Sequence, residues 1–247
     1  MIIDVHGHLG YDFVFDEDFT EAELHEAHEH GVDVTIVQPG TCMWLDDVKR
    51  QHDAIADLCA RYPGQFFGMA NPCPHLDEND YRSEMERCVR DLKFVGVKFH
   101  PLAHAVRPGG RASEKVMATA RHLGIPVMVH TGAGAPFALP SAMIPVAQKY
   151  ADVPIILAHA GASIYAGEAV LAARLCPNVY LDTSWTAGYN LRRWARELGA
   201  NRLMLASDHG DNAATELAKH RTIGLTADEL EWCLGKTAST VYKLPLA

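Results

Sequence analysis

The sequence lacks any long hydrophobic run. A membrane-spanning helix needs about 20 consecutive apolar residues, and the longest apolar stretches, such as residues 153–158, are far shorter. Residues 1–5 also lack the basic region followed by a longer apolar region that marks a secretory signal. We therefore expect a cytoplasmic protein with no membrane partner.

The sequence also lacks an excess of basic charge. Its 22 Lys and Arg residues stand against 31 Asp and Glu residues, which gives a formal net charge of −9. A surface of this charge repels the phosphate backbone of a nucleic acid. Nucleic acid is therefore not an expected partner.

Cysteine pairs with C-x-x-C spacing are absent from the sequence. Its six cysteines are scattered, and a chain of 247 residues can bury a core without disulfides. We expect reduced, buried thiols. The remaining composition, 48% hydrophobic and 21% charged, is that of an ordinary globular protein and excludes disorder.

Short apolar segments alternate along the whole chain with segments of helical periodicity. Eight segments are predicted as strands: 2–5, 34–37, 66–70, 95–99, 126–129, 155–158, 179–182 and 203–206. The helical segments between them include 24–29, 48–61, 81–92, 114–123, 144–150, 169–175 and 194–198. Residues 226–246 are predicted as a capping helix and tail.

Eight strand–helix units in 247 residues predict an α/β fold, a (β/α)8 TIM barrel formed by residues 1–247 as a single domain. Several strands are almost continuously apolar, as a parallel sheet covered by helices requires. A doubly wound open sheet is the alternative, but the number of units favours a closed barrel.

Histidines, acids and a lysine lie where the predicted strands end. In a barrel of this kind the chemistry is carried by the carboxyl ends of the strands. The residues at or just after these ends are His6, His8, Lys98, His100, His130, His159 and Asp208. We expect these side chains to meet at one rim of the barrel.

The spacing of the first two histidines favours a metal site. His6 and His8 are two residues apart, so in an extended strand both side chains project to the same face. With His130 and Asp208 they form a first site of nitrogen and carboxylate ligands. Such a set suits Zn, Mn, Fe or Co, and zinc is our default. His159 is left as a ligand of a second ion or as a proton carrier, so one or two ions per chain are expected.

Lys98 has two interpretations. It is either a cation that faces the substrate or, if carbamylated by carbon dioxide, a carboxylate that bridges two metals. His100 shares its face of the strand and is predicted to contact substrate. Arg111, in the loop region after the fourth strand, is a further candidate partner for a substrate carboxylate.

Six motifs resemble the amidohydrolase superfamily, and within it the amidohydrolase-2 family of metal-dependent hydrolases and decarboxylases. They are IDVHGH at 3–8, GVKFHP at 96–101, VHTG at 129–132, LAHAG at 157–161, VYLDTS at 179–184 and ASD at 206–208. The resemblance implies that His6, His8, His130 and Asp208 bind a divalent metal. It also implies that His159 binds a second metal or orients the attacking water. His209 and Gly210 depart from the Tyr-Pro that often follows the last of these motifs.

The main functional hypothesis is hydrolysis of an amide, lactone or ester in a small, carboxylated molecule. A metal lowers the pKa of bound water from 15.7 to roughly 7, and Asp208 and His159 are the expected catalytic residues. The first alternative is non-oxidative decarboxylation of a small aromatic or enoic acid. A catalytically inactive metal-binding barrel is a third. A homo-oligomer is compatible with each of them.

Overall fold

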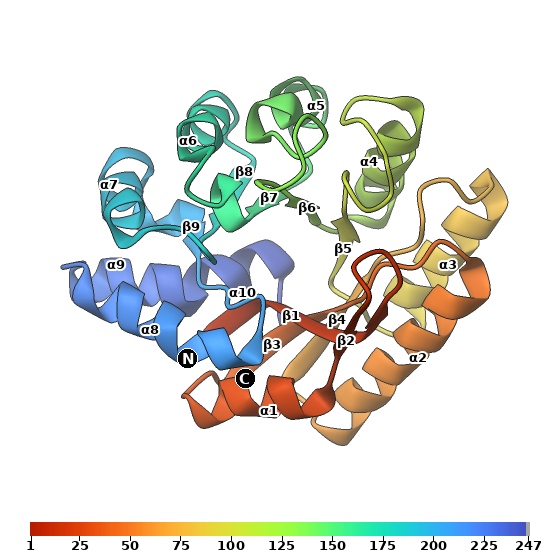
Figure 1. The fold of residues 1–247 in the computed structure, drawn as a ribbon, viewed down its shortest axis with the longest axis horizontal. Helices are drawn as coiled ribbons and strands as arrows, with labels where there is room; N and C mark the ends of the chain where they lie inside the picture. Colours follow the sequence, from red (N-terminus) through yellow and green to blue (C-terminus); the bar gives the residue numbers. More distant parts are fainter. Residues whose placement is uncertain (246–247) are drawn as a thin grey trace.

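The computed structural model describes residues 1–245 and shows a curled nine-stranded sheet surrounded by helices (Figure 1). The strands lie in the order β2-β1-β3-β4-β5-β6-β7-β8-β9, and all pairs except β1 with β2 are parallel. Their bounds are β1 Ile3–Asp12, β2 Glu17–Phe19, β3 Val34–Pro39, β4 Phe66–Ala70, β5 Gly96–Phe99, β6 Val127–His130, β7 Ile155–Ala158, β8 Val179–Asp182 and β9 Leu203–Met204.

Backbone hydrogen bonds join the two ends of the parallel sheet. The N–H of Val5 in β1 donates to the carbonyl of Leu205 just after β9, at 3.1 Å. The N–H of Asp208 donates to the carbonyl of His6, at 2.8 Å. The predicted TIM-barrel fold is therefore confirmed, and the open doubly wound alternative is wrong.

The helices form the outer layer around the strands (Figure 1). They are α1 Glu21–Glu29, α2 Leu45–Arg61, α3 Glu78–Arg90, α4 Arg111–Leu123, α5 Ile144–Lys149, α6 Ala166–Leu175, α7 Gly188–Leu198, α8 Ala213–Thr222, α9 Ala227–Glu231 and α10 Thr237–Tyr242. Local signals set several starts: the Thr20 side chain caps α1 with Glu23 in a capping box, and Asp77 caps α3. None of the helices within residues 1–245 is both long and apolar enough to cross a membrane.

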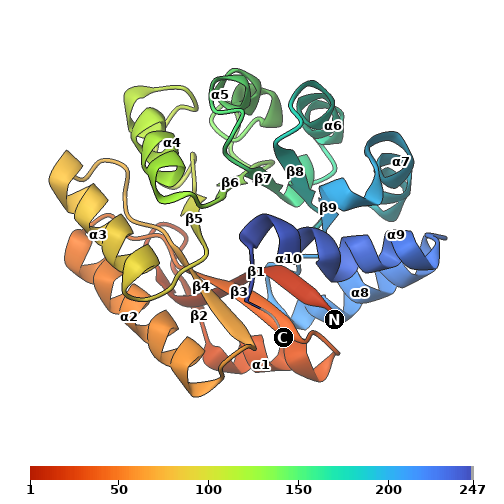
Figure 2. The same ribbon diagram turned by 180° about the vertical axis from the view of Figure 1, so that it is seen from behind.

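The closing segment covers the amino ends of the strands. The predicted segment 226–246 contains α9, a π-helical turn at Trp232–Lys236 and α10, while Leu246 lies outside the described residues. Figure 2 shows α10 beside the start of β1 on this side. Val241 and Tyr242 pack against the core of the barrel together with Ile3. The closing segment does not cover the opposite, carboxyl end of the barrel.

A hairpin is the main feature of the fold that the sequence analysis missed. β1 does not end at Val5 but continues to Asp12, and β2 pairs antiparallel with its second half. Asp12 holds the turn because its carboxylate accepts hydrogen bonds from the N–H groups of Val14, Phe15 and Thr41, at 2.8 to 3.0 Å. The hairpin therefore stands above the carboxyl end of the barrel.

Candidate active site

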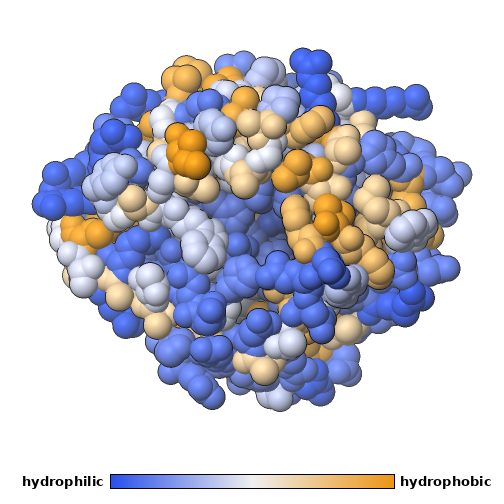
Figure 3. All heavy atoms as spheres, viewed as in Figure 1, coloured by the Kyte–Doolittle hydropathy of each residue, from blue (hydrophilic) through white to orange (hydrophobic). Residues whose placement is uncertain are grey.

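The strand-end residues surround a cavity of about 180 Å³ at the carboxyl end of the barrel. All seven residues singled out from the strand ends line this cavity, together with the hairpin residues Phe15 and Phe19. Figure 3 shows the same face, where hydrophilic residues lie in the central recess and apolar residues along part of its edge. The lining comprises His6, His8, Lys98, His100, His130, His159 and Asp208 together with residues from β3, the hairpin and the loops.

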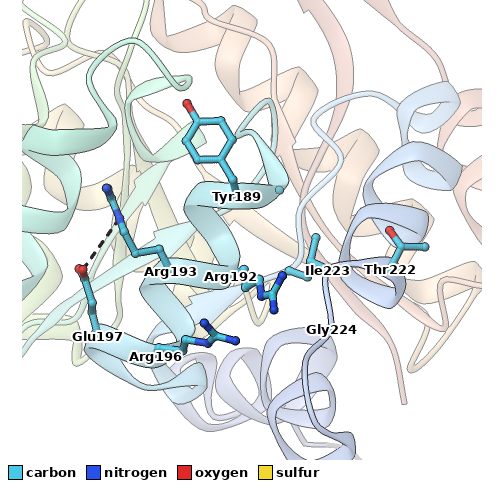
Figure 4. Close-up of a pocket in the computed structure, with 9 residues that line it drawn as sticks. Tyr189, Arg192, Arg193, Arg196, Glu197, Thr222, Ile223 and Gly224 are labelled. Carbon is cyan, nitrogen blue, oxygen red and sulfur yellow. Dashed lines mark ion pairs between the residues drawn. The ribbon is translucent and has the colours of Figure 1, made fainter.

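A larger hollow of about 800 Å³ lies on the outer layer, between α7 and the segment that follows α8 (Figure 4). Its lining includes Arg192, Arg193 and Arg196 and none of the strand-end residues. Size alone therefore does not identify the reaction site. The smaller cavity is the better candidate, because chemically active side chains converge on it.

Three potential ligand atoms converge in the central cavity. Nε2 of His6 lies 3.1 Å from Nε2 of His8, and Oδ1 of Asp208 lies 3.0 and 3.3 Å from these two atoms. We call His6, His8 and Asp208 the central trio. The alternation of β1 places the two histidines on one face, and the backbone bond between Asp208 and His6 brings the carboxylate to them.

The proton on His6 is held on the far side of its ring. Nδ1 of His6 donates to Oδ2 of Asp182 at 2.6 Å, so Nε2 of the neutral ring presents a lone pair to the trio. Burial and the charge of Lys98 lower the pKa of His6 to about 3, and burial also lowers the pKa of His8. Both rings are therefore neutral at pH 7.

Asp208 is ionised in this setting. Burial alone would raise its pKa, but the electrostatic influence of His6 and His159 and the hydrogen bond with His8 outweigh burial and hold the pKa well below its usual range. Its second oxygen, Oδ2, accepts a hydrogen bond from Nε1 of Trp185 at 2.8 Å. Oδ1 of Asp208 is thus the oxygen that faces His6 and His8.

The trio fits a divalent metal ion. Three atoms 3.0 to 3.3 Å apart can all lie about 2.1 Å from one point, which is the bond length of a divalent transition metal to nitrogen and oxygen. Neutral imidazoles and an ionised carboxylate are the forms that bind such an ion. The hydrogen bond from His6 to Asp182 is also the carboxylate–histidine arrangement that orients metal ligands.

Lys98 lies at the edge of the trio. Its Nζ is 2.8 Å from Nε2 of His6 and 3.9 Å from Sδ of Met128, and only 3% of the residue is exposed. Burial lowers the pKa of Lys98 to about 8, although the charges of Asp208 and Asp182 oppose the shift. Carbamylation of this amine stays a prediction.

The other predicted residues divide into those that line the cavity and one that does not. His100 and His130 stack with ring centroids 4.0 Å apart, and Nε2 of His130 bonds to the carbonyl of Ala133 at 2.9 Å. Nε2 of His130 is therefore directed at Ala133 and not at the trio. His159 lies 4.9 Å from His6 by ring centroids. Arg111 is exposed at the start of α4, outside the lining of the central cavity.

Three residues at or next to the cavity have a strained backbone conformation. His159, Trp185 and Asp208 all have positive φ, at 60°, 56° and 70°, which is uncommon for residues other than glycine. Such conformations persist where the surrounding structure holds them and are frequent at functional sites. Asp182 and Trp185 were not singled out by the sequence analysis, although Asp182 ends the strand at 179–182 as the other site residues end theirs.

A second histidine–carboxylate cluster lies in the outer layer, between α2 and α3. Nδ1 of His52 donates to Oε1 of Glu84 at 2.6 Å, and Sγ of Cys88 lies 3.2 Å from the same nitrogen. All three residues are buried. We call them the sealed cluster. The sequence analysis did not find it, because its members lie on helices without a distinctive local spacing.

Comparisons with known proteins agree with this architecture. The model of the amidohydrolase-2 family, described as amidohydrolase, matches residues 3–244, so the chain belongs to this family. A curated relative, γ-resorcylate decarboxylase of Rhizobium radiobacter, is 30% identical over 88 residues. This match spans 32% of the chain and 27% of that decarboxylase.

Solved structures of similar fold include several decarboxylases. 5-Carboxyvanillate decarboxylase from Sphingomonas paucimobilis has a TM-score of 0.79 and 16% identity, with 98% of this chain and 99% of that chain covered. 2,6-Dihydroxybenzoate decarboxylase from Rhizobium has a TM-score of 0.75 and 16% identity, with 98% of each chain covered. A dihydroxybenzoic acid decarboxylase from Polaromonas sp. JS666, solved with manganese and 2-nitroresorcinol, has a TM-score of 0.75 and 18% identity, with 100% of this chain and 98% of that chain covered.

The ligand geometry supports a divalent metal, and the family match supports an enzyme of this family. Most of the named relatives are decarboxylases, beside two structures named as amidohydrolases, so the relatives agree better with the alternative hypothesis than with the hydrolase that we expected first. A solved relative contains manganese, so the identity of the metal as zinc stays a prediction.

Proposed function

We propose that the protein catalyses the metal-dependent, non-oxidative decarboxylation of a small aromatic acid. The observation that carries this proposal is the central trio, which opens into a small cavity beside the buried amine of Lys98. The decarboxylases among the relatives support the same reaction type. Hydrolysis of an amide, lactone or ester uses the same kind of site and is distinguished by experiment.

The size and walls of the cavity suit one ring. Its volume of about 180 Å³ is below the about 300–1,000 Å³ of pockets that hold drug-sized ligands. Aromatic side chains cover it: Phe15 lies 5.4 Å from His100 and Phe19 lies 4.6 Å from His8, measured between ring centroids. An aromatic acid can therefore place its ring against these side chains and its carboxylate at the polar floor.

His6, His8 and Asp208 would hold the ion, and His130 and His159 stay as further proposed ligands from the sequence. When bound, a divalent ion supplies positive charge to the carboxylate and to a neighbouring oxygen of the substrate. Lys98 lies beside the trio and, when protonated, adds a second positive charge at the floor. These charges fix the orientation of the acid.

The reaction breaks the bond between the ring carbon and the carboxylate carbon. Carbon dioxide leaves, the electron pair stays on the ring carbon, and a proton takes the place of the carboxylate. We assign the delivery of this proton to the side of the cavity lined by His159. His159 is held in place there by the hydrogen bond between its Nδ1 and Oγ of Ser184, at 2.8 Å.

The test follows the carboxylate carbon and the ring proton. Protein supplied with Mn²⁺ is incubated in D₂O with carboxyl-¹³C-labelled 2,6-dihydroxybenzoate or 5-carboxyvanillate. We expect one labelled carbon dioxide per product molecule and one deuterium on the ring carbon. The proposal is wrong if neither acid releases carbon dioxide while a panel of lactones and amides incorporates ¹⁸O from labelled water.

A further inference from the structure

One polar side chain on the wall of the cavity has no partner for its carbonyl oxygen. Asn71 follows β4 directly and lines the cavity with Lys98 and Phe15. Only 1% of Asn71 is exposed, and its Oδ1 is buried without a hydrogen-bond partner among residues 1–245. Buried acceptors are almost always hydrogen-bonded in folded proteins. An unpartnered acceptor at a ligand cavity therefore indicates a donor that arrives with the ligand.

The backbone of Asn71 is held from behind by the sealed cluster. Its N–H donates to Nε2 of His52 at 3.0 Å, and Nδ1 of His52 donates to Oε1 of Glu84 at 2.6 Å. Because Glu84 fixes the proton of the neutral ring on Nδ1, Nε2 is the acceptor that the N–H of Asn71 requires. Arg87 donates to both oxygens of Glu84, at 2.9 and 2.8 Å. A continuous set of hydrogen bonds thus runs from α3 to the cavity wall.

The position of Asn71 fits a substituent on the ring rather than the carboxylate. The trio is carried by β1 and by the segment after β9, whereas β4 is separated from β1 by β3. An acid whose carboxylate lies at the trio and beside Lys98 therefore turns its remaining ring positions toward other walls, including the wall formed by the end of β4. A hydroxyl group there can donate to Oδ1 of Asn71, and a C–H group cannot.

Resting on the proposed function, we infer that Asn71 is a specificity-determining residue that accepts a hydrogen bond from a hydroxyl group on the substrate ring. His52 and Glu84 are positioning residues, which act by holding Asn71 at the cavity wall. The sealed cluster is thereby connected to substrate recognition without contacting the substrate.

The test compares acids that differ by hydroxyl groups. Binding of benzoate, 3-hydroxybenzoate, 4-hydroxybenzoate and 2,6-dihydroxybenzoate to the Mn²⁺-loaded protein is measured by calorimetry. The wild type is expected to bind at least one hydroxylated acid about tenfold more tightly than benzoate. Asn71→Leu has the same number and branching of heavy side-chain atoms and no polar one, and it is expected to lose this preference, measured as the ratio of its affinities for the hydroxylated acid and for benzoate.

A matched control makes the same substitution outside the cavity. Asn190 is also buried, and its Nδ2 has no partner among the described residues, but it lies on α7 and is not part of the cavity lining. Asn190→Leu is expected to keep the preference for the hydroxylated acid. Thermal unfolding of each variant reports whether it has folded.

The positioning role is tested by a double-mutant cycle. His52→Phe is expected to reduce the preference in the wild-type background and to change it no further in the Asn71→Leu background, because His52 acts through Asn71. An equal effect of His52→Phe in both backgrounds overturns the positioning role.

Two results overturn the specificity role in distinguishable ways. If Asn71→Leu keeps the wild-type preference while the wild type releases carbon dioxide from a hydroxylated acid, the inference is wrong and the proposed function stands. If the wild type binds none of the four acids and releases no carbon dioxide from them, the proposed function fails and the inference fails with it.

Discussion

The central trio and the sealed cluster contain nearly the same chemical groups in very different states. In both places a carboxylate lies 2.6 Å from Nδ1 of a buried histidine: Glu84 of the sealed cluster beside His52, and Asp182, which lies outside the trio, beside His6 of the trio. In the sealed cluster the other nitrogen of the ring accepts the N–H of Asn71, and Arg87 donates to the carboxylate. In the trio the other nitrogen of His6 faces a second imidazole and a second carboxylate across the cavity.

The two places differ in the groups that the remaining lone pairs of the histidines and carboxylates face. The sealed cluster satisfies its histidine and carboxylate with hydrogen bonds inside the protein, so these groups stabilise the fold. In the trio the ligand atoms face a shared position beside the amine of Lys98, where a divalent ion would bind. Residue type alone therefore does not define a reaction centre, whereas the direction of the lone pairs and access to a cavity do. The following changes test this contrast, from the largest expected effect to the smallest.

Asp208→Asn should have the largest effect on activity. It removes the negative charge of the trio, which would hold the divalent ion, so we expect the turnover number to fall by about 10²–10⁴-fold. The rate of carbon dioxide release, measured at saturating Mn²⁺ and substrate, checks this. Near-wild-type turnover with an unchanged metal content would contradict the role given to Asp208.

Glu84→Gln should act on stability instead. Burial would raise the pKa of Glu84, but hydrogen bonds from His52 and Arg87 lower it from 4.5 to about 2. Because the folded protein holds this proton more weakly than the unfolded chain, the ionised carboxylate stabilises the fold above pH 4.5, and the benefit disappears as the pH falls toward 2. A shift of this size corresponds to about 3 kcal/mol.

Urea unfolding of the wild type and Glu84→Gln at several pH values measures this effect. The gap between the two free energies of unfolding should be largest above pH 5 and should close toward pH 2. A gap that does not change with pH would show that the carboxylate charge is not responsible.

Asp182→Asn sharpens the comparison, because Asp182 corresponds to Glu84 in its contact with a histidine. The variant loses the carboxylate that orients His6, and such changes weaken metal binding by about 10–100-fold. Titration of the metal-free protein with Mn²⁺, followed by electron paramagnetic resonance, measures the dissociation constant. Glu84→Gln serves as the matched control and should bind Mn²⁺ as the wild type does.

Lys98→Met should have a smaller effect. It keeps an unbranched side chain but removes the charge beside the trio, so we expect KM for the acid to rise about tenfold, the usual scale of a charge-assisted hydrogen bond. Metal content in bicarbonate buffer is measured in parallel. Two ions per chain in the wild type and one or none in the variant would show instead that Lys98 is a carbamylated metal ligand.

The barrel could be predicted from the sequence because its strands are short, apolar and separated by helical periodicity. The convergence of His6, His8, Lys98 and Asp208 followed from the rule that strand ends of a parallel barrel meet at one rim. The β1–β2 hairpin was missed, although apolar residues at 9, 11, 13 and 15 alternate with Gly10, Asp12 and Asp16, because its turn depends on the hydrogen bonds of the Asp12 carboxylate, which no local pattern reports.

Side-chain direction limited the prediction of the site. His130 ends its strand as predicted, but its Nε2 bonds to Ala133, and no sequence pattern reports that orientation. Arg111 follows the fourth barrel strand in sequence, yet it starts a helix whose exposed side lies outside the cavity lining. His52 and Asn71 are brought together only by the packing of α2 beneath β4.

The central claim is that the trio, and not the sealed cluster, holds the divalent ion. The most direct measurement is the number and affinity of Mn²⁺ ions bound per chain by the metal-free wild type, by His8→Ala with Asp208→Ala, and by His52→Phe with Glu84→Gln. We expect a tight site in the wild type and in the folded sealed-cluster variant, and its loss in the trio variant. Tight binding that survives in the trio variant, or that disappears only in the sealed-cluster variant, would contradict the account.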